Sequence, residues 1–292
     1  MRGWPPMPSA ASRSASRPSD VEIGFVSPAA SVVPRIDVLG VEVSAIDMPI
    51  ALATIDAWIA AHERRYVCVT GVHGIMESRN DEALRRIHND AGLVTPDGMP
   101  LVWLGWWQGQ RGMDRVYGPD LVLACCAHSQ ARGYRHFFYG GGDGVAALLS
   151  ERLRARFPEL QVVGTYTPPF RPLSALEETE LARQIAAAAP DILWVGLSTP
   201  KQERWMAEHI GRLQVPVMIG VGAAFDFHAG LKRQAPRWVQ RAGLEWLFRL
   251  GTEPRRLWRR YLANNPRFVW HVARQLLRAS GHHRASAPAV TS

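Results

Sequence analysis

The sequence predicts an α/β protein with a mostly parallel sheet, helices on both faces of that sheet, and a basic amphipathic helical appendage at the C-terminus. Two observations predict the sheet. Short apolar runs alternate with longer helix-like stretches from about residue 36, and polar residues or glycines follow several of the runs. This alternation is typical of parallel sheets covered on both faces. A third observation, the arginines and aromatic residues that gather after about residue 250, predicts the appendage.

Length and composition divide the chain into four expected regions. The 292 residues are 47% apolar, which allows one large buried core. Residues 1–34 are rich in Ser, Pro and Ala, and we expect them to form a disordered leader, with a disordered tail over 281–292. The α/β domain is expected over 35–250, and the appendage over 251–280 at a membrane surface. No apolar run of about 18 residues occurs, so we expect no transmembrane helix.

The expected strands of the sheet are six apolar runs, namely residues 66–69, 92–95, 134–139, 161–166, 192–197 and 215–221. Helical spacing follows two of them, over 74–88 and 145–157. In open parallel sheets, ligands bind beyond the carboxyl ends of the strands. The candidate ligand-binding residues are therefore those that follow strands: Thr70, Asp97, Gly140 to Gly144, Ser198 to Gln202, and Asp226.

The cysteines of the chain are expected to be buried thiols, and they are Cys68, Cys125 and Cys126. An odd and sparse count does not fit a disulfide framework and favours a reducing compartment. Apolar residues flank the adjacent pair, and no second cysteine pair or histidine pair nearby completes a metal site.

The positive charge of the chain is concentrated near its C-terminus. The net charge is +8, and between residues 241 and 284 ten arginines stand against two glutamates, so this segment accounts for the whole excess. Helices are predicted over 254–264 and 266–280, each opened by a proline and each with an arginine face opposite an apolar one. Such helices are typical of membrane-surface anchors, although packing on the main domain fits the pattern equally. Because the charge is not spread over a face, we expect an anionic lipid surface and no nucleic acid.

Asp97 is the candidate catalytic base. It follows a predicted strand and lies between Pro96 and Gly98, which give a sharp turn with little bulk beside the carboxylate. A carboxylate presented in this way accepts a proton from an attacking hydroxyl, as general base catalysis requires. The run 95–98 taken alone fits a turn or a helix cap better, so the assignment depends on the other motifs.

Two loops are candidates for phosphate binding. Residues 140–144 connect a strand to a helix, where backbone amides hold anions, although a tight turn explains the glycines as well. In the second loop, Lys201 would pair with a phosphate and Gln202 with a polar edge of the ligand. The same residues fit a helix start, with Thr199 as the N-cap and Glu203 completing a capping pattern.

Two other chemistries receive little support from the sequence. Gly220 and Gly222 begin a dinucleotide-binding pattern, but Phe225 occupies the third glycine position, which argues against a nicotinamide-dependent oxidoreductase. Asp226 and His228 are two residues apart, but no third metal ligand is apparent. We therefore expect no metal and no cofactor.

Taken together, the motifs resemble the WecB/TagA/CpsF family, glycosyltransferase family twenty-six. The likeness covers about residues 36–270, and six motifs occur in order. They are residues 93–98, 115–121, 138–141, 196–203 and 220–226, with a closing block made of 235–238, 243–246 and 253–256.

The resemblance implies a Rossmann-like α/β fold with a C-terminal appendage that meets the membrane. It implies an inverting transfer from a UDP-sugar to an undecaprenyl-diphosphate-linked saccharide, without a metal, in cell-surface polysaccharide or exopolysaccharide biosynthesis. The sugar is of the N-acetylmannosamine, N-acetylmannosaminuronic acid or glucose type. The expected location is cytoplasmic, peripheral on the inner face of the cytoplasmic membrane, and a homo-oligomer is compatible with the family.

The resemblance also assigns residue roles. Asp97 becomes the base that activates the acceptor hydroxyl. The expected substrate-binding residues are Thr70, Thr95, Arg115, Gly140, Gly141, Gln202 and Asp226. The arginines expected to hold the lipid diphosphate or the membrane are Arg249, Arg255, Arg256, Arg259 and Arg260, since guanidinium groups bind phosphate through paired contacts.

One position departs from the family pattern, because many members carry Asn where this chain has Val72. The neighbouring His73 is the candidate to compensate. The alternative function is a non-catalytic, membrane-associated scaffold of a polysaccharide assembly complex. The intact run 95–98 and Gln202 favour the enzyme.

Overall fold

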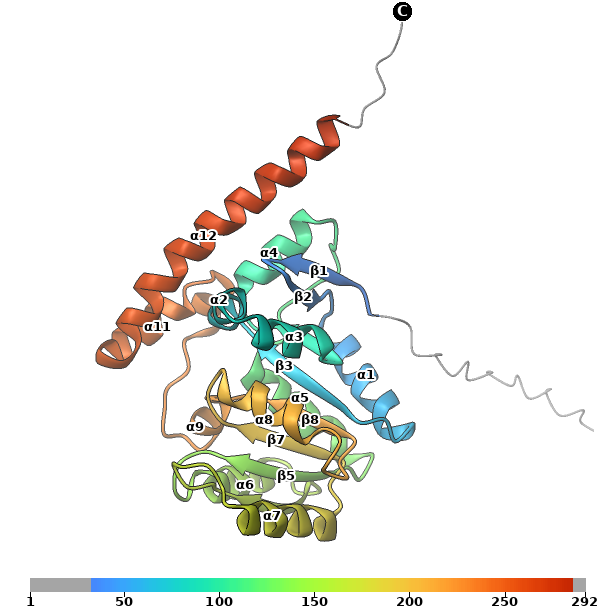
Figure 1. The fold of residues 1–292 in the computed structure, drawn as a ribbon. Coiled ribbons are helices and arrows are strands. Elements are labelled where there is room, and N and C mark those ends of the chain that lie inside the picture. The colour runs from blue at the N-terminus through green and yellow to red at the C-terminus, as the bar shows by residue number, and fades with distance from the viewer. Residues whose placement is uncertain (1–32, 286–292) are drawn as a thin grey trace, which may run out of the picture. The chain divides into compact units, whose positions relative to one another are not determined.

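The computed structural model describes residues 33–285, with side chains described as far as Arg278. Most of the leader expected over 1–34, and residues 286–292 of the expected tail, lie outside the described residues. The predicted parallel sheet is confirmed: six strands lie in the order β4-β3-β8-β7-β5-β6, and every neighbouring pair is parallel. The strands are β3 (Arg65–Thr70), β4 (Leu93–Pro96), β5 (Arg135–Gly140), β6 (Gln161–Tyr166), β7 (Ile192–Gly196) and β8 (Val217–Gly220) (Figure 1).

Alternating side chains of the strands pack into two separate cores, one on each face of the sheet. On one face, Val67 of β3 and Phe138 of β5 pack against four helices. These helices are α1 (Met48–Ala60), α5 (Gly118–Gln130), α6 (Val145–Arg156) and α9 (Ala224–His228).

The opposite core contains the neighbouring strand residues Tyr66, Cys68 and Phe137. The helices on this side are α2 (Val72–Asn80), α3 (Glu82–Asp90), α4 (Met99–Trp107), α7 (Ala175–Ala188) and α8 (Lys201–His209). An antiparallel hairpin that the sequence analysis did not predict, β1 (Arg35–Val38) with β2 (Val41–Ser44), packs into the same core. The chain ends in α10 (Arg237–Arg241), α11 (Glu245–Thr252) and α12 (Pro254–Ala285).

The single helix predicted over 74–88 is wrong, because two helices occupy this stretch. Asp81 lies between α2 and α3 in an extended conformation, with φ −131° and ψ 103°. Its Oδ1 accepts a hydrogen bond from the Leu84 amide over 3.0 Å, which is the geometry of an N-cap. A capping aspartate inside a helical pattern therefore divided the segment.

The break predicted at Pro266 is also wrong, because α12 is one continuous helix that includes this proline (Figure 1). Proline removes one backbone N–H from a helix interior and usually interrupts it. Here Phe268 and Val272, which follow the proline, are buried in the core beside α2 and α8. Their burial outweighs the local signal, and the helix extends beyond residue 280 to Ala285.

The C-terminal helix packs directly on the α/β domain. Leu257 and Tyr261 are buried near its start, and Phe268 and Val272 further along. Gln275 then contacts the β1–β2 hairpin, since its Nε2 donates to Oδ1 of Asp37 over 2.6 Å and its Oε1 accepts from the Leu39 amide over 3.1 Å. The arginine-rich helix therefore has a defined position over the carboxyl ends of the strands.

The cysteines are buried and free, as predicted. Within residues 33–285, no helix is both long enough and apolar enough to cross a membrane.

Candidate active site

A cavity of about 2100 Å³ opens at the carboxyl ends of the parallel strands. Its walls come from the ends of β3, β7 and β8, from the loop after β4, and from α4, α8, α11 and α12. Sites for one small molecule usually measure about 300–1000 Å³, so this cavity has room for more than one ligand. Asp97 lines it together with four of the predicted substrate-binding residues, Thr70, Arg115, Gly141 and Asp226.

Asp97 is fixed at the cavity wall while part of its carboxylate stays open. Its amide donates to the carbonyl oxygen of Thr70 over 3.0 Å, and the Gly118 amide at the start of α5 donates to Oδ1 over 2.9 Å. No hydrogen bond among the described residues reaches Oδ2. Gly71 lies beside this oxygen, and a Cβ there would be 3.5 Å from it. The carboxylate is therefore positioned to accept a proton from a bound hydroxyl.

Arg115 connects Asp97 to the C-terminal helices. Its Nε donates to the carbonyl oxygen of Asp97 over 2.6 Å, its Nη1 donates to Gln240 over 2.8 Å, and its Nη2 pairs with Glu245. The Tyr117 hydroxyl donates to the other oxygen of Glu245 over 2.8 Å. Burial raises the pKa of Glu245, and the positive charge of Arg115 opposes this rise. Because three of its five N–H donors are used within the protein, Arg115 has a structural role here, and its contact with substrate stays a prediction.

Three of the five arginines predicted to bind the lipid diphosphate line the cavity, namely Arg249, Arg256 and Arg260. Arg256 and Arg260 are four residues apart and share one face of α12. Arg255 and Arg259 occupy the adjacent face, outside the cavity. The helical projection from sequence placed all four on one arc, and the structure separates them into an inward pair and an outward pair.

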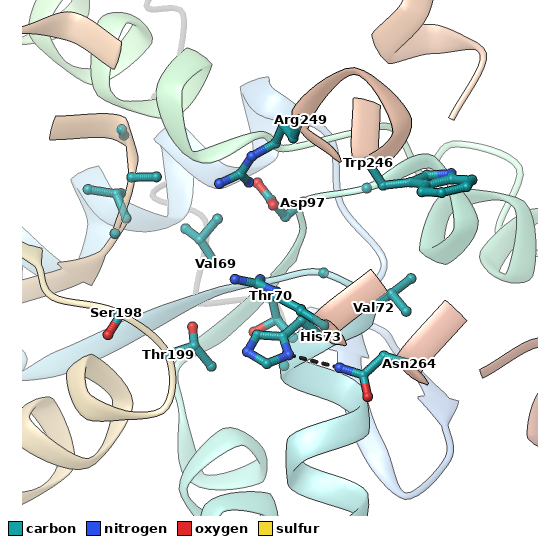
Figure 2. Close-up of a pocket in the computed structure, with 18 of the residues that line it drawn as sticks. Val69, Thr70, Val72, His73, Asp97, Ser198, Thr199, Trp246, Arg249 and Asn264 are labelled. Carbon is teal, nitrogen blue, oxygen red and sulfur yellow. Dashed lines mark hydrogen bonds between the residues drawn. The ribbon is translucent and has the colours of Figure 1, made fainter. Parts of the chain in front are cut away.

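Figure 2 shows the Arg249 guanidinium pointing toward the Asp97 carboxylate. Burial opposes the charge of Arg249, but the acidic groups around it, Tyr261 and Glu245 foremost, raise its pKa above the ordinary value. Nε of Arg249 and Nε of Arg260 are buried without a hydrogen-bond partner among the described residues. Buried donors of this kind are usually satisfied, so both are suited to an anionic ligand.

His73 contacts the C-terminal helix inside the cavity. The Asn264 side-chain amide donates to Nδ1 of His73 over 3.1 Å (Figure 2). Burial, followed by the positive charges of Arg260 and Arg249, lowers the pKa of His73 to about 3. The ring is therefore neutral near pH 7. Val72 lines the cavity next to it, so the side-chain amide at this end of the site comes from Asn264 of α12.

The two predicted threonines have different surroundings. Thr70 lines the cavity at the end of β3, and its hydroxyl donates to the Cys68 carbonyl over 3.4 Å. Thr95 is completely buried outside the cavity lining, and its hydroxyl donates to the Val116 carbonyl over 3.3 Å. Thr95 is thus enclosed within the protein, contrary to the prediction that it faces substrate, because its strand position points into the core.

The glycines after β5 allow a close approach to β7. A Cβ at Gly140, where φ is +123°, would lie 2.7 Å from the carbonyl carbon of Gly196. The Gly141 amide donates to the Gly196 carbonyl over 3.0 Å. Gly141 and Gly142 line the cavity, whereas Gly140 does not. Since the Gly141 amide is already bonded, anion binding by residues 140–144 would depend on the remaining amides.

Gln202 lies behind the cavity wall, beside a buried carboxylate that the sequence analysis did not assign a ligand role. Its Nε2 donates to Oε1 of Glu203 over 3.0 Å, and the Thr199 hydroxyl donates to the same oxygen over 2.9 Å. Oε1 of Gln202 and Oε2 of Glu203 are buried without a partner among the described residues. Thr199 itself lines the cavity. Glu203 therefore holds two residues of the loop that borders the site.

The capping pattern predicted for this loop is wrong. Helix α8 begins at Lys201 with Pro200 at the N-cap position and no side-chain cap. The Ser198 carbonyl accepts the Lys201 amide over 2.7 Å instead. The Thr199 hydroxyl donates to Oε1 of Glu203 over 2.9 Å.

Asp226 lines the cavity and forms an ion pair with Lys232 over 2.7 Å. Lys232 also lies 3.6 Å from Glu253, which pairs with Arg256 over 2.8 Å. His228 does not join Asp226 and does not line the cavity, since its Nε2 contacts the Pro119 carbonyl over 2.8 Å. Across the described residues, no group of three or more His, Cys, Asp or Glu could hold a metal ion.

Glu203, Glu245 and Asn264 hold parts of the site in position, and they were not among the predicted site residues. Glu203 and Glu245 fall inside two of the motifs found in the sequence. Their place in these motifs is the only sequence feature that could have pointed to a role in the site. Asn264 lies in α12 one turn after the inward-facing Arg260, a relation that becomes visible only once α12 is placed over the cavity.

The chain was found to be similar to known proteins over most of its length. The model of the family described as "Glycosyl transferase WecG/TagA/CpsF family" matches residues 36–282. The N-acetylglucosaminyldiphosphoundecaprenol N-acetyl-beta-D-mannosaminyltransferase of Bacillus spizizenii is 31% identical over 211 residues, which cover 72% of this chain and 77% of that protein. The protein of the same name from Staphylococcus aureus is 23% identical over 242 residues, which cover 82% of this chain and 92% of that protein.

Proposed function

The chain belongs to the WecG/TagA/CpsF family of glycosyl transferases, and from this premise we propose that it transfers a sugar from a UDP-sugar to an undecaprenyl-diphosphate-linked saccharide. The first candidate donor sugar is N-acetylmannosamine and the first candidate acceptor is N-acetylglucosaminyldiphosphoundecaprenol, because the relatives are named for that transfer. N-acetylmannosaminuronic acid and glucose are the other candidate sugars. The product would belong to a cell-surface polysaccharide or exopolysaccharide.

The observation that supports this proposal most strongly is the arrangement around Asp97. An open carboxylate oxygen and three arginines, Arg249, Arg256 and Arg260, line the same cavity. A glycosyl transfer to a lipid-diphosphate acceptor needs both features, a base for the acceptor hydroxyl and cations for the diphosphate. A redox or purely structural role requires neither.

In the proposed reaction, Oδ2 of Asp97 accepts the proton of the acceptor hydroxyl as its oxygen attacks the anomeric carbon of the donor. The bond from that carbon to the UDP oxygen breaks, and the configuration inverts because attack and departure take place on opposite faces. The Gly118 amide at the N-terminus of α5 holds Oδ1 of Asp97 by a hydrogen bond over 2.9 Å, which leaves Oδ2 to receive the proton. The residues that bind the donor would be those on the β3, β7 and β8 side of the cavity.

The donor side of the cavity also offers a substitute for the family's Asn at position 72. The Asn264 amide lies in the cavity next to His73 and within the same wall as Val72. We propose that Asn264, oriented by the neutral ring of His73, supplies the amide contact that Val72 lacks. If the His73→Ala variant kept the donor KM and the turnover of the wild type, this part of the proposal would be dropped.

The membrane contact is proposed for the outward arginines of α12. Arg255 and Arg259 are exposed, and each cation near an anionic surface contributes about 1 kcal/mol of attraction. The inward arginines would at the same time face the diphosphate of an acceptor that is itself anchored in the bilayer. We therefore propose that the protein acts at the cytoplasmic face of the membrane, alone or as a homo-oligomer.

The experiment that tests the function is a donor screen. Purified protein is mixed with synthetic N-acetylglucosaminyldiphosphoundecaprenol and each UDP-sugar in turn, with and without EDTA, and UDP release and the lipid product are measured. We expect product with one N-acetylmannosamine-type donor, and the same rate in EDTA. If no donor gives a product while the protein still binds vesicles, the alternative of a non-catalytic scaffold replaces the enzyme.

A further inference from the structure

A line of apolar side chains leads from Asp97 to the protein surface along α4. This helix begins at Met99, two residues after Asp97. Met99, Trp103 and Trp107 are spaced by four residues, so they lie on one face of the helix. With a rise of about 1.5 Å per residue, this stripe is about 12 Å long from Met99 to Trp107.

The exposure of the stripe increases with distance from Asp97. Met99 is 9% exposed, Trp103 is 44% exposed and Trp107 is 53% exposed, and all three line the cavity. Leu244 and Trp246, at the start of α11, line the same cavity. Large aromatic side chains left open in this way on a cavity wall are suited to a long apolar ligand.

Trp103 is seated against the backbone of the loop before α11. A Cβ at Gly243, where φ is +70°, would lie 2.6 Å from the Trp103 ring, so only glycine permits this contact. The ring therefore has a defined position between α4 and the loop, although nearly half of its surface remains open. This packing gives the stripe a second wall and makes it a groove.

We infer that this groove, formed by Met99, Trp103, Trp107, Leu244 and Trp246, binds the first isoprene units of the lipid acceptor. The inference rests on the proposed function. The cationic part of the cavity, with Arg249, Arg256 and Arg260, matches a diphosphate, and the apolar part matches a hydrocarbon chain. The volume of about 2100 Å³ exceeds what one small ligand fills, as a donor plus a chain-bearing acceptor requires.

A second apolar stretch of the same cavity is one competing route, in addition to the exposed side chains Leu262, Val269 and Trp270 of α12. Pro168, Pro169 and Phe170 line it near α8, and Phe170 is 95% exposed. This loop follows β6 at the far end of the sheet from β4, whereas Asp97 directly follows β4. The α4 groove is therefore favoured, because it begins beside the residue that must meet the acceptor hydroxyl.

A kinetic test compares two acceptors in detergent solution, so that no bilayer is present. N-acetylglucosaminyl diphosphate is attached to an undecaprenyl chain in one and to a short alkyl chain in the other. The wild type should prefer the long chain in kcat/KM by about tenfold or more, and Trp103→Ala/Trp107→Ala should lose most of that preference. Trp107→Ala alone, which leaves the Gly243 contact intact, should lose part of it.

Matched controls are Trp238→Ala and Trp258→Ala, since both tryptophans are exposed, by 71% and 47%, and neither lines the cavity. They should keep the chain-length preference of the wild type. Equal losses in the controls would show a general surface effect, and an absent preference in the wild type would show that no chain site exists. Either result overturns the inference.

A binding test separates this inference from the proposed function. A prenyl diphosphate with a diazirine in its chain is photolysed with the intact protein, and labelled peptides are identified by mass spectrometry. Labelling of residues 99–107 supports the groove whether or not transfer occurs. Labelling confined to residues 168–173 or to α12 contradicts it.

Discussion

Nε of Arg115 donates a hydrogen bond to the carbonyl oxygen of Asp97 over 2.6 Å, and the same guanidinium pairs with Glu245 at the start of α11. Through this one side chain the backbone of the candidate base is connected to the C-terminal helices. The position of Asp97 in the cavity and the position of α11 are therefore coupled.

Arg115→Ala should separate these two parts of the site. The variant leaves Glu245 buried without its cation, and removing one partner of a buried ion pair costs about 3–5 kcal/mol. We expect a lower melting temperature and a turnover reduced by about 100-fold, since small displacements of a base have effects of that size. Arg111→Ala, an exposed neighbour, is the control. Unchanged turnover in Arg115→Ala would exclude the coupling.

Glu203 should act as a positioning residue for the loop 198–202. Glu203→Ala removes the acceptor of the Thr199 and Gln202 hydrogen bonds, so the donor KM should rise about tenfold or more while turnover changes less. Glu203→Gln keeps one acceptor oxygen and should restore part of the donor affinity. Steady-state kinetics over a range of donor concentrations give this split. A loss of stability with an unaltered KM would leave Glu203 with a structural role only.

His73 should make the protein less stable as the pH falls. Its folded pKa of about 3 lies below the ordinary value of 6.5, so the neutral ring stabilises the fold above pH 6.5 and this contribution is lost on acidification toward pH 3. The slope per group is at most about 1.4 kcal/mol per pH unit. Urea unfolding of wild type and His73→Gln at pH 7 and pH 5 measures it. The variant should show a smaller decrease, and equal decreases would refute the assignment.

The two arginine pairs of α12 provide a matched comparison. Arg256→Ala/Arg260→Ala and Arg255→Ala/Arg259→Ala remove the same charge from the same helix, but only the first pair lines the cavity. The outward variant should bind anionic vesicles more weakly, by about 1 kcal/mol for each arginine near the surface, and the inward variant should lose less. Only the inward pair should also raise the KM for a short, soluble diphosphate acceptor. Equal acceptor KM values for the two variants would contradict the assignment of the inward pair.

The sheet and the position of Asp97 could be predicted because both leave strong local patterns. Buried parallel strands appear as apolar runs, and the polar residues that follow them gather at one edge. The continuity of α12 could not be predicted, because Pro266 is a local signal for a break and the burial of Phe268 overrides it. The same holds for Asp81, whose capping role divided a stretch with continuous helical spacing.

Side-chain roles were harder to predict than elements. A projection of α12 gives the apolar face but not its rotation relative to the cavity, so it could not separate Arg256 and Arg260 from Arg255 and Arg259. Glu203 is a charged residue in a helical pattern, and its burial depends on packing that no periodicity reports. Thr95 shares a motif with Asp97, but Thr95 still belongs to strand β4 and points into the core, whereas Asp97 follows the end of that strand.

Asp97→Asn tests the central claim most directly, because it removes the proton acceptor while keeping the shape of the side chain and its bond to the Gly118 amide. The measurement is single-turnover transfer to the lipid acceptor together with UDP binding by calorimetry. We predict a transfer rate lowered by about 100-fold or more with UDP affinity unchanged. Transfer at the rate of the wild type would contradict the assignment of Asp97 as the base.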